Sequence, residues 1–182
     1  MTRTLKGIVL GMAGLLFALP TISSAAVSSP RAEAALQEKV RHELVMLPYL
    51  SIFDHLQFNV DDGHVTLMGE VNRPILKSDA EGVVRNIEGV TGITNQIKVL
   101  PLSSFDNDIR WRVARAVYGY GPLQRYAMGA RPPIHIIVDN GNVKLEGVVA
   151  NETDKNLAYL RANGVFGVFN VQNNLRVEGK EG

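Results

Sequence analysis

Titratable residues that could perform acid–base or metal chemistry are few and scattered in this sequence of 182 residues. Asp61 and Asp62 are adjacent carboxylates, but Gly63 follows them, and Asp-Gly between alternating apolar residues is typical of a tight hairpin turn. The sequence contains no nucleophile elbow, zinc-protease helix, phosphate-binding loop or dinucleotide fingerprint. The histidines share no ligand spacing: His42, His55, His64 and His135. We therefore predict no catalytic residues, no metal site and no cofactor.

A second group of residues suits binding rather than catalysis. It combines aromatic rings with arginines. Trp111, Arg115 and Tyr118 have the helical spacing i, i+4 and i+7. The other members of the group are Arg112, Arg125, Tyr126 and Arg131. Between Phe105 and Ile134 five arginines accompany two aspartates, a net charge of +3. Rings and guanidinium groups together suit the headgroup level of an anionic membrane. We predict that these residues contact a phospholipid surface or a protein partner.

The chain that must position these residues contains one segment twice, at an offset of 78 residues without a gap. Residues 60–71 return as residues 138–149, and the same offset relates Gly89 to Gly167. A register held over about forty positions identifies a duplicated module. Differences between the copies therefore bear on function.

Each copy predicts the same order of elements: helix, strand, strand, helix and strand. In the first copy, Ser29-Pro30 is typical of a helix start. An apolar stripe follows it at i, i+4 and i+8: Leu36, Val40 and Leu44. Apolar and polar residues alternate on both sides of the turn, which predicts two strands. Pro74 begins the second helix, and residues 93–99 are the last strand.

The second copy repeats this order, with a first stripe made of Ile109, Val113 and Val117. We expect an α+β fold of two tandem αββαβ modules, at residues 31–100 and 105–178. Each should be a small mixed three-stranded sheet covered by two helices. The linker between them is short.

Two pairs of equivalent residues are expected to stabilise the fold rather than to form a binding site. Gly69 and Gly147 fall on the inner face of their strands, where we expect a helix backbone to approach closely. Asn95 and Asn173 lie among apolar neighbours, so we expect each side chain to hydrogen-bond buried backbone.

Both copies share the pattern D-x-G-x-V-x-L-x-G-x-V, followed later by G-V-x-x-V/I-x-N-x-L/I-x-V. Together with the αββαβ order, these patterns resemble the BON domain of bacterial envelope proteins. The resemblance implies an exported protein that contacts phospholipid membranes and has no catalytic residues. In one respect the chain departs from some tandem-BON relatives, which carry an N-terminal lipid, because it has no cysteine to accept one.

The N-terminal residues are typical of an export signal. Arg3 and Lys6 make a basic start, residues 8–19 are an apolar run, and residues 24–26 are small. Twelve residues are too few to span a bilayer, which takes about 20. We therefore expect residues 1–26 to be cleaved rather than kept as an anchor, and the protein to enter the periplasm or to be secreted. The remaining chain has 17 basic and 18 acidic residues, which argues against a nucleic-acid partner.

The copies differ most around the first helix. Aligning the helices by their stripes places Glu38 and His42 opposite Trp111 and Arg115. Two hypotheses follow for these rings: they serve a membrane or partner surface, or Trp111 and Tyr118 are buried against the first copy. The leading hypothesis is a non-catalytic envelope protein that binds the membrane surface and supports envelope integrity under stress. The alternative is an interaction module that docks on an envelope assembly or secretion complex.

Overall fold

The computed structural model describes residues 30–129 and 131–179. The predicted signal peptide lies outside these residues. Among them, no helix combines the length and the apolar character that a membrane crossing requires.

The first module has the predicted order of elements. They are α1 (Pro30–Val45), β1 (His55–Asp61), β2 (His64–Val71), α2 (Pro74–Arg85), β3 (Gly92–Asn95) and β4 (Lys98–Val99). β1 pairs antiparallel with β2, and β3 and β4 both run parallel to β2. The predicted last strand is thus divided in two. The Asn95 side chain accepts the amide of Ile97 at 3.2 Å, and this local bond interrupts the ladder.

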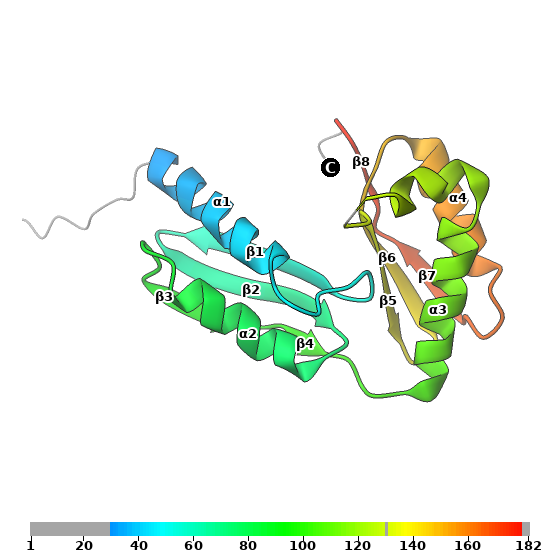
Figure 1. Cartoon of the computed structure of the whole chain (residues 1–182), viewed down its shortest axis with the longest axis horizontal. Coiled ribbons are helices and arrows are strands. Elements are labelled where there is room, and N and C mark those ends of the chain that lie inside the picture. The colour runs from blue at the N-terminus through cyan, green and yellow to red at the C-terminus, as the bar shows by residue number, and fades with distance from the viewer. Residues whose placement is uncertain (1–29, 130, 180–182) are drawn as a thin grey trace, which may run out of the picture.

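The second module repeats this topology. Its elements are α3 (Ser104–Tyr118), the 3₁₀ helix η1 (Gly121–Ala127), β5 (Ile134–Asp139), β6 (Asn142–Val149), α4 (Glu152–Asn163), β7 (Asn170–Asn173) and β8 (Arg176–Val177). In Figure 1, α3 and α4 cover the face of the second sheet that points away from the first module. The structure confirms the α+β fold with two repeated modules, each a small mixed sheet with helices.

The two hairpin turns have the predicted chemistry. Asp62 and Gly63 have φ angles of 47° and 79°, and the equivalent Asn140 and Gly141 have 51° and 76°. Two successive residues with positive φ make the turn whose twist matches that of paired strands. Asp61 and Asp62 therefore serve the turn.

The sequence predicted that a helix backbone approaches the mid-strand glycines, and this prediction was wrong. Gly69 has φ +112°, and a Cβ there would lie 2.0 Å from the carbonyl oxygen of His55. Gly147 has φ +118°, and a Cβ there would lie 1.9 Å from the oxygen of Pro133. The close neighbour is the adjoining strand or the residue that leads into it, because at this positive φ a Cβ would point at the neighbouring backbone of the same sheet.

The asparagine expectation is confirmed in both copies. Asn95 donates from Nδ2 to the carbonyl of Lys77, and Asn173 donates to that of Lys155, each at 2.9 Å. Each asparagine thereby ties its last strand to the helix before it.

Each module has its own apolar core, and the predicted stripes of α1 and α3 are buried in them. The core of the second module also contains Phe53, which belongs to the segment between α1 and β1. The modules are therefore joined by more than their linker.

Candidate contact face and the seam between the modules

The seam between the modules is built around Phe53. Its side chain is 7% exposed and packs in the core of the second module. Its ring meets that of Trp111 edge to face, with 4.9 Å between the centroids. The neighbouring carbonyl of Ile52 accepts the amide of Ile136 at 2.7 Å, at the edge of β5. A segment of the first module thus completes both the core and a sheet edge of the second.

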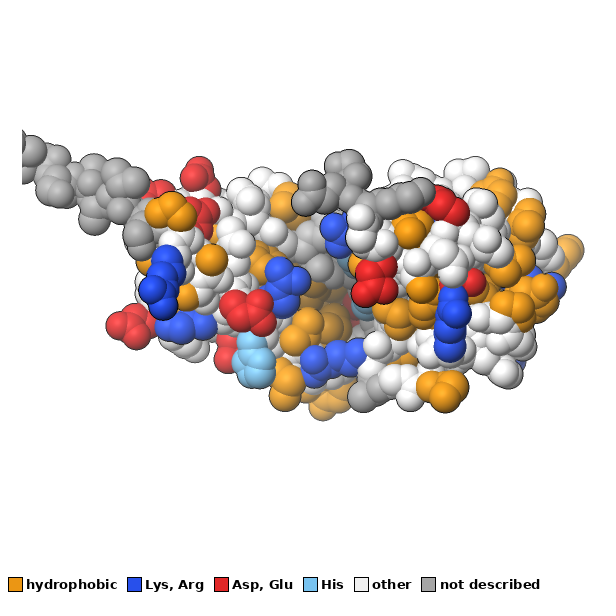
Figure 2. All heavy atoms as spheres, turned by 90° about the horizontal axis from the view of Figure 1, so that it is seen from above, with side chains coloured by type: hydrophobic (Ala, Val, Ile, Leu, Met, Phe, Trp, Pro, Cys, Tyr) orange, Lys and Arg blue, Asp and Glu red, His pale blue; other side chains and the backbone are white. Residues whose placement is uncertain are grey.

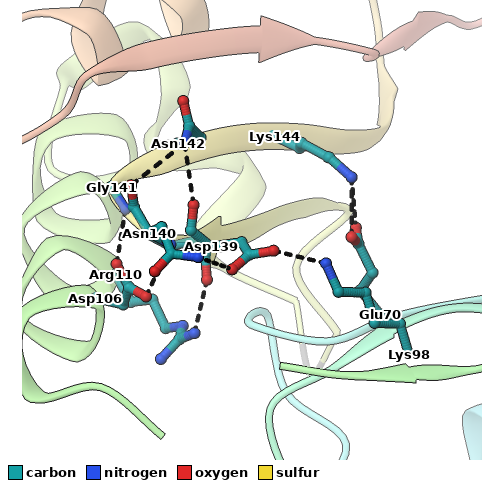
Figure 3. A network of polar contacts seen from close by, with 10 residues as sticks. Glu70, Lys98, Asp106, Arg110, Asp139, Asn140, Gly141, Asn142 and Lys144 are labelled. Carbon is teal, nitrogen blue, oxygen red and sulfur yellow. Dashed lines mark hydrogen bonds and ion pairs between the residues drawn. The ribbon is translucent and has the colours of Figure 1, made fainter. Parts of the chain in front are cut away.

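Two ion pairs cross the seam next to the second hairpin (Figure 3). Lys98 lies 2.6 Å from Asp139, and Lys144 lies 2.9 Å from Glu70. The hydrogen bond with Asp139 raises the pKa of Lys98 above its ordinary value. Both pairs join strands of different modules, so they lie directly across the seam.

The start of α3 is anchored to the same hairpin. Asp106 is buried and accepts the amides of Asn140 at 3.0 Å and Gly141 at 2.8 Å. Arg110 is only 2% exposed and donates to the carbonyl of Val138 at 2.8 Å. Arg110 therefore contributes little to the surface charge that the sequence suggests for this region.

Three of the predicted contact residues lie on the outer side of α3. Trp111 is 54% exposed, Arg115 is exposed and Arg112 is half-buried. Arg112 donates to the carbonyl of Phe166 at 3.3 Å, and its guanidinium lies 3.7 Å from Asp108. Trp111 therefore fits both hypotheses, the exposed contact surface and burial against the first module, since its ring contacts Phe53 while about half of its side chain stays exposed.

Tyr118 does not lie on the outer side, and that part of the prediction was wrong. Its ring is half-buried against the core of its own module, and its hydroxyl donates to the carbonyl of Ile134. Burial raises the pKa of the phenol well above its ordinary value. The ring lies at the end of α3, where its length reaches β5, so it bridges helix and sheet.

Arg125 and Tyr126 lie on η1 and face the start of α4. The carboxylate of Asp154 accepts from both side chains, and the Tyr126 hydroxyl accepts the amide of Ala150 at 2.9 Å. These bonds hold the long loop against its own module. Arg131 lies elsewhere, in the seam, with Nη2 3.0 Å from Sδ of Met46.

Two histidines that are far apart in the sequence meet at the seam. The rings of His55 and His135 lie 5.4 Å apart, and Nε2 of His55 lies 3.9 Å from Glu146. Burial, followed by the charges of His135 and Arg176, lowers the pKa of His55 to about 4. Burial also lowers the pKa of His135. Within the described residues no group of three potential ligands is arranged to hold a metal ion.

Comparison with known families identifies both modules. The BON domain model matches residues 32–101 and 125–179. The chain belongs to the BON domain family. BON domains are associated with membrane-interacting envelope proteins and are generally non-catalytic. The second match begins after α3, so the helix that carries Trp111 lies outside the matched part of the second BON domain.

A comparison with curated proteins found no match. Among solved structures, the chain matches CdsD, a structural protein of the type III secretion system of Chlamydia trachomatis, at 13% identity over 80% of this chain and 94% of that chain. It also matches the C-terminal domain of CdsD at 14% identity, over 78% of this chain and 96% of that chain. The TM-scores, 0.31 and 0.29, are too low to establish a common fold.

The contact residues predicted from the sequence did not include three exposed aromatic rings of the second BON domain. Phe166 and Phe169 are 86% and 73% exposed, and Phe105 lies 6.1 Å from Phe169 between ring centroids. The first BON domain has non-aromatic residues at the equivalent places: Ala32, Glu88 and Thr91. The repeat itself held the signal, because comparing the copies position by position finds all three substitutions.

These rings and the outer side of α3 form one surface of the second BON domain, linked by the Arg112–Phe166 bond and the contact between the Phe105 and Phe169 rings. We call it the aromatic–basic face. Its members are Phe105, Trp111, Arg112, Arg115, Phe166 and Phe169.

Proposed function

We propose that this protein is a non-catalytic component of the bacterial envelope that binds anionic phospholipid surfaces through the aromatic–basic face. The difference between the two BON domains carries the proposal. At equivalent positions, the second domain has the exposed rings of Phe105, Trp111 and Phe166 where the first has Ala32, Glu38 and Glu88. Because both domains keep the same fold, the substitutions are not required by folding.

The chemistry of the face suits a membrane interface. Moving exposed phenylalanine rings from water into the acyl boundary of a membrane lowers the free energy. Guanidinium groups bind lipid phosphate at the adjoining headgroup level. Large exposed apolar groups on a soluble domain commonly mark such contacts. The predicted export signal and the tandem arrangement, which resembles the osmotically induced periplasmic protein, support a periplasmic location and a role in envelope integrity under stress.

The expected affinity is modest. Arg112 and Arg115 contribute about 1 kcal/mol each near an anionic surface. Insertion of Phe166 and Phe169 contributes about 2 kcal/mol each. The sum of about 6 kcal/mol corresponds to a dissociation constant on the order of 0.05 mM. Such binding is reversible and depends on salt.

Vesicle co-sedimentation tests the proposal. The protein should sediment with vesicles that contain phosphatidylglycerol, bind phosphatidylcholine vesicles poorly, and be released as salt screens the charges. Replacing both phenylalanines (Phe166→Ala and Phe169→Ala) should abolish sedimentation, as should Arg112→Glu with Arg115→Glu. The matched control is Arg31→Glu with Lys39→Glu, which makes the same charge change on α1 and should leave binding intact.

The alternative function is a module that docks on a protein complex of the envelope through the same face. The exposed rings are also compatible with that role, because aromatic residues and arginine are enriched at protein interfaces. Vesicle binding that is absent at low salt, or unchanged in both double variants, would exclude the membrane proposal and leave this alternative.

A further inference from the structure

Two cavities adjoin one another along the seam. One, of about 580 Å³, lies between the end of α1, the segment around Phe53, and residues 131–135. The other, of about 480 Å³, lies between α1, the start of β1 and Gly147. They share four wall residues, Val45, Leu50, Pro133 and His135, and we call the two together the seam cleft. Figure 2 shows the hollow between the two modules, with hydrophobic side chains inside it and basic side chains beside it.

The walls of this seam cleft are largely apolar, and both modules contribute to them. They include Leu44, Leu47, Leu56, Phe58, Trp111 and Val148. The carboxylate of Asp54 is already engaged, since it accepts from Ser51 at 2.6 Å and from the amide of Asn72 at 2.7 Å. His55 and His135 are neutral at neutral pH because burial lowers the pKa of both. The interior therefore suits hydrocarbon better than a peptide backbone, which would need polar partners.

Positive charge lies where the cleft opens. Arg131 lines the first cavity and Arg41 lines the second, and both side chains are exposed. Arg41 has an ion pair with Glu38 at 3.5 Å, but both groups are well solvated, so the pair holds the guanidinium only weakly. A guanidinium group binds a carboxylate with two parallel hydrogen bonds.

We propose that the seam cleft binds one long-chain fatty acid, with its acyl chain between the modules and its carboxylate at Arg131. The cleft has the size and the apolar walls of small-molecule sites, which span about 300–1,000 Å³. The site goes beyond the proposed membrane contact, because its ligand is a single molecule taken out of water rather than a lipid surface.

Binding can be measured with undecanoic acid that carries a dansyl group on its last carbon, used below the concentration at which it forms micelles. Trp111 lines the cleft and is the only tryptophan, so energy transfer from it reports occupancy of this site. We expect saturation at one probe per protein and displacement by palmitate. Displacement by hexadecanol should be about tenfold weaker or more, the cost of one charged hydrogen bond.

Variants locate the ligand. Val45→Phe narrows the cleft and should abolish transfer, whereas Val83→Phe, at a half-buried valine on α2, should not. Val148→Phe is a second blocking variant at a more exposed site. Arg131→Glu should weaken palmitate about tenfold or more, while Arg85→Glu should leave its affinity unchanged.

Several results would overturn the proposal. They are no saturable transfer, transfer that survives both blocking variants, equal displacement by palmitate and hexadecanol, or displacement by lysophosphatidylglycerol but not by palmitate. The test is separate from that of the membrane contact. Arg112→Glu with Arg115→Glu should abolish vesicle binding but keep the fatty acid, and Val148→Phe should do the reverse.

Discussion

Replacing Phe53 with alanine should destabilise the second module, although Phe53 belongs to the first. The side chain is 7% exposed within the second core, and truncating a buried phenylalanine costs about 3–5 kcal/mol. Its neighbour Trp111 is half exposed and can shift into part of the space, so we expect the lower end, about 3 kcal/mol. At about 4–8 °C per kcal/mol for a domain of this size, the second module should melt at least about 12 °C lower.

The single tryptophan makes this measurement specific. Trp111 contacts Phe53, so Phe53→Ala should shift its emission to longer wavelength in the folded state and lower the midpoint of its thermal transition. Phe58→Ala is the control, because Phe58 packs against the first core. It should lower the transition seen by circular dichroism and leave Trp111 emission unchanged. A Phe53→Ala protein with wild-type emission and midpoint would refute the account of the seam.

Three further predictions concern stability. Gly147→Ala should destabilise the fold strongly, because its Cβ would clash with backbone at 1.9 Å, whereas Gly82→Ala, in open space on α2, should stabilise it by up to about 1 kcal/mol; thermal denaturation compares the two. Asp106→Ala removes the acceptor of two turn amides and should cost about 2 kcal/mol in urea unfolding. The unfolded chain, with a histidine pKa near 6.5, binds more protons than the folded protein, in which the pKa of His55 is about 4. Stability should therefore fall as pH falls from about 6.5 to 4, and His55→Gln should reduce that slope.

Local patterns were sufficient to predict the fold of each module. The stripe of Leu36, Val40 and Leu44 fixes one face of a helix, and Asp62-Gly63 fixes a turn, whatever the rest of the chain does. The second copy shows the same patterns, so each helix and strand was predicted from two independent segments. The break in the last strand was missed because it depends on the side chain of Asn95, which no periodicity reports.

The seam was not predictable from the same patterns. Phe53 lies in a connecting segment with no periodicity, and its burial depends on a surface of the other module. For the same reason His55 and His135 look unrelated in the sequence. Tyr118 was misplaced because helical spacing gives a direction from the axis but not the reach of a long ring. Trp111, Arg112 and Arg115 were placed well because short spacing on one helix determines their common side.

The two copies use the loop after their first helix in opposite ways. In the first copy the short loop reaches across and covers the edge of β5 through Ile52. In the second copy the longer loop forms η1 and folds back, with Leu123 in its own core and Tyr126 on Asp154. Because the second loop turns inward, it covers its own core and leaves the outer side of α3 free of its own loop.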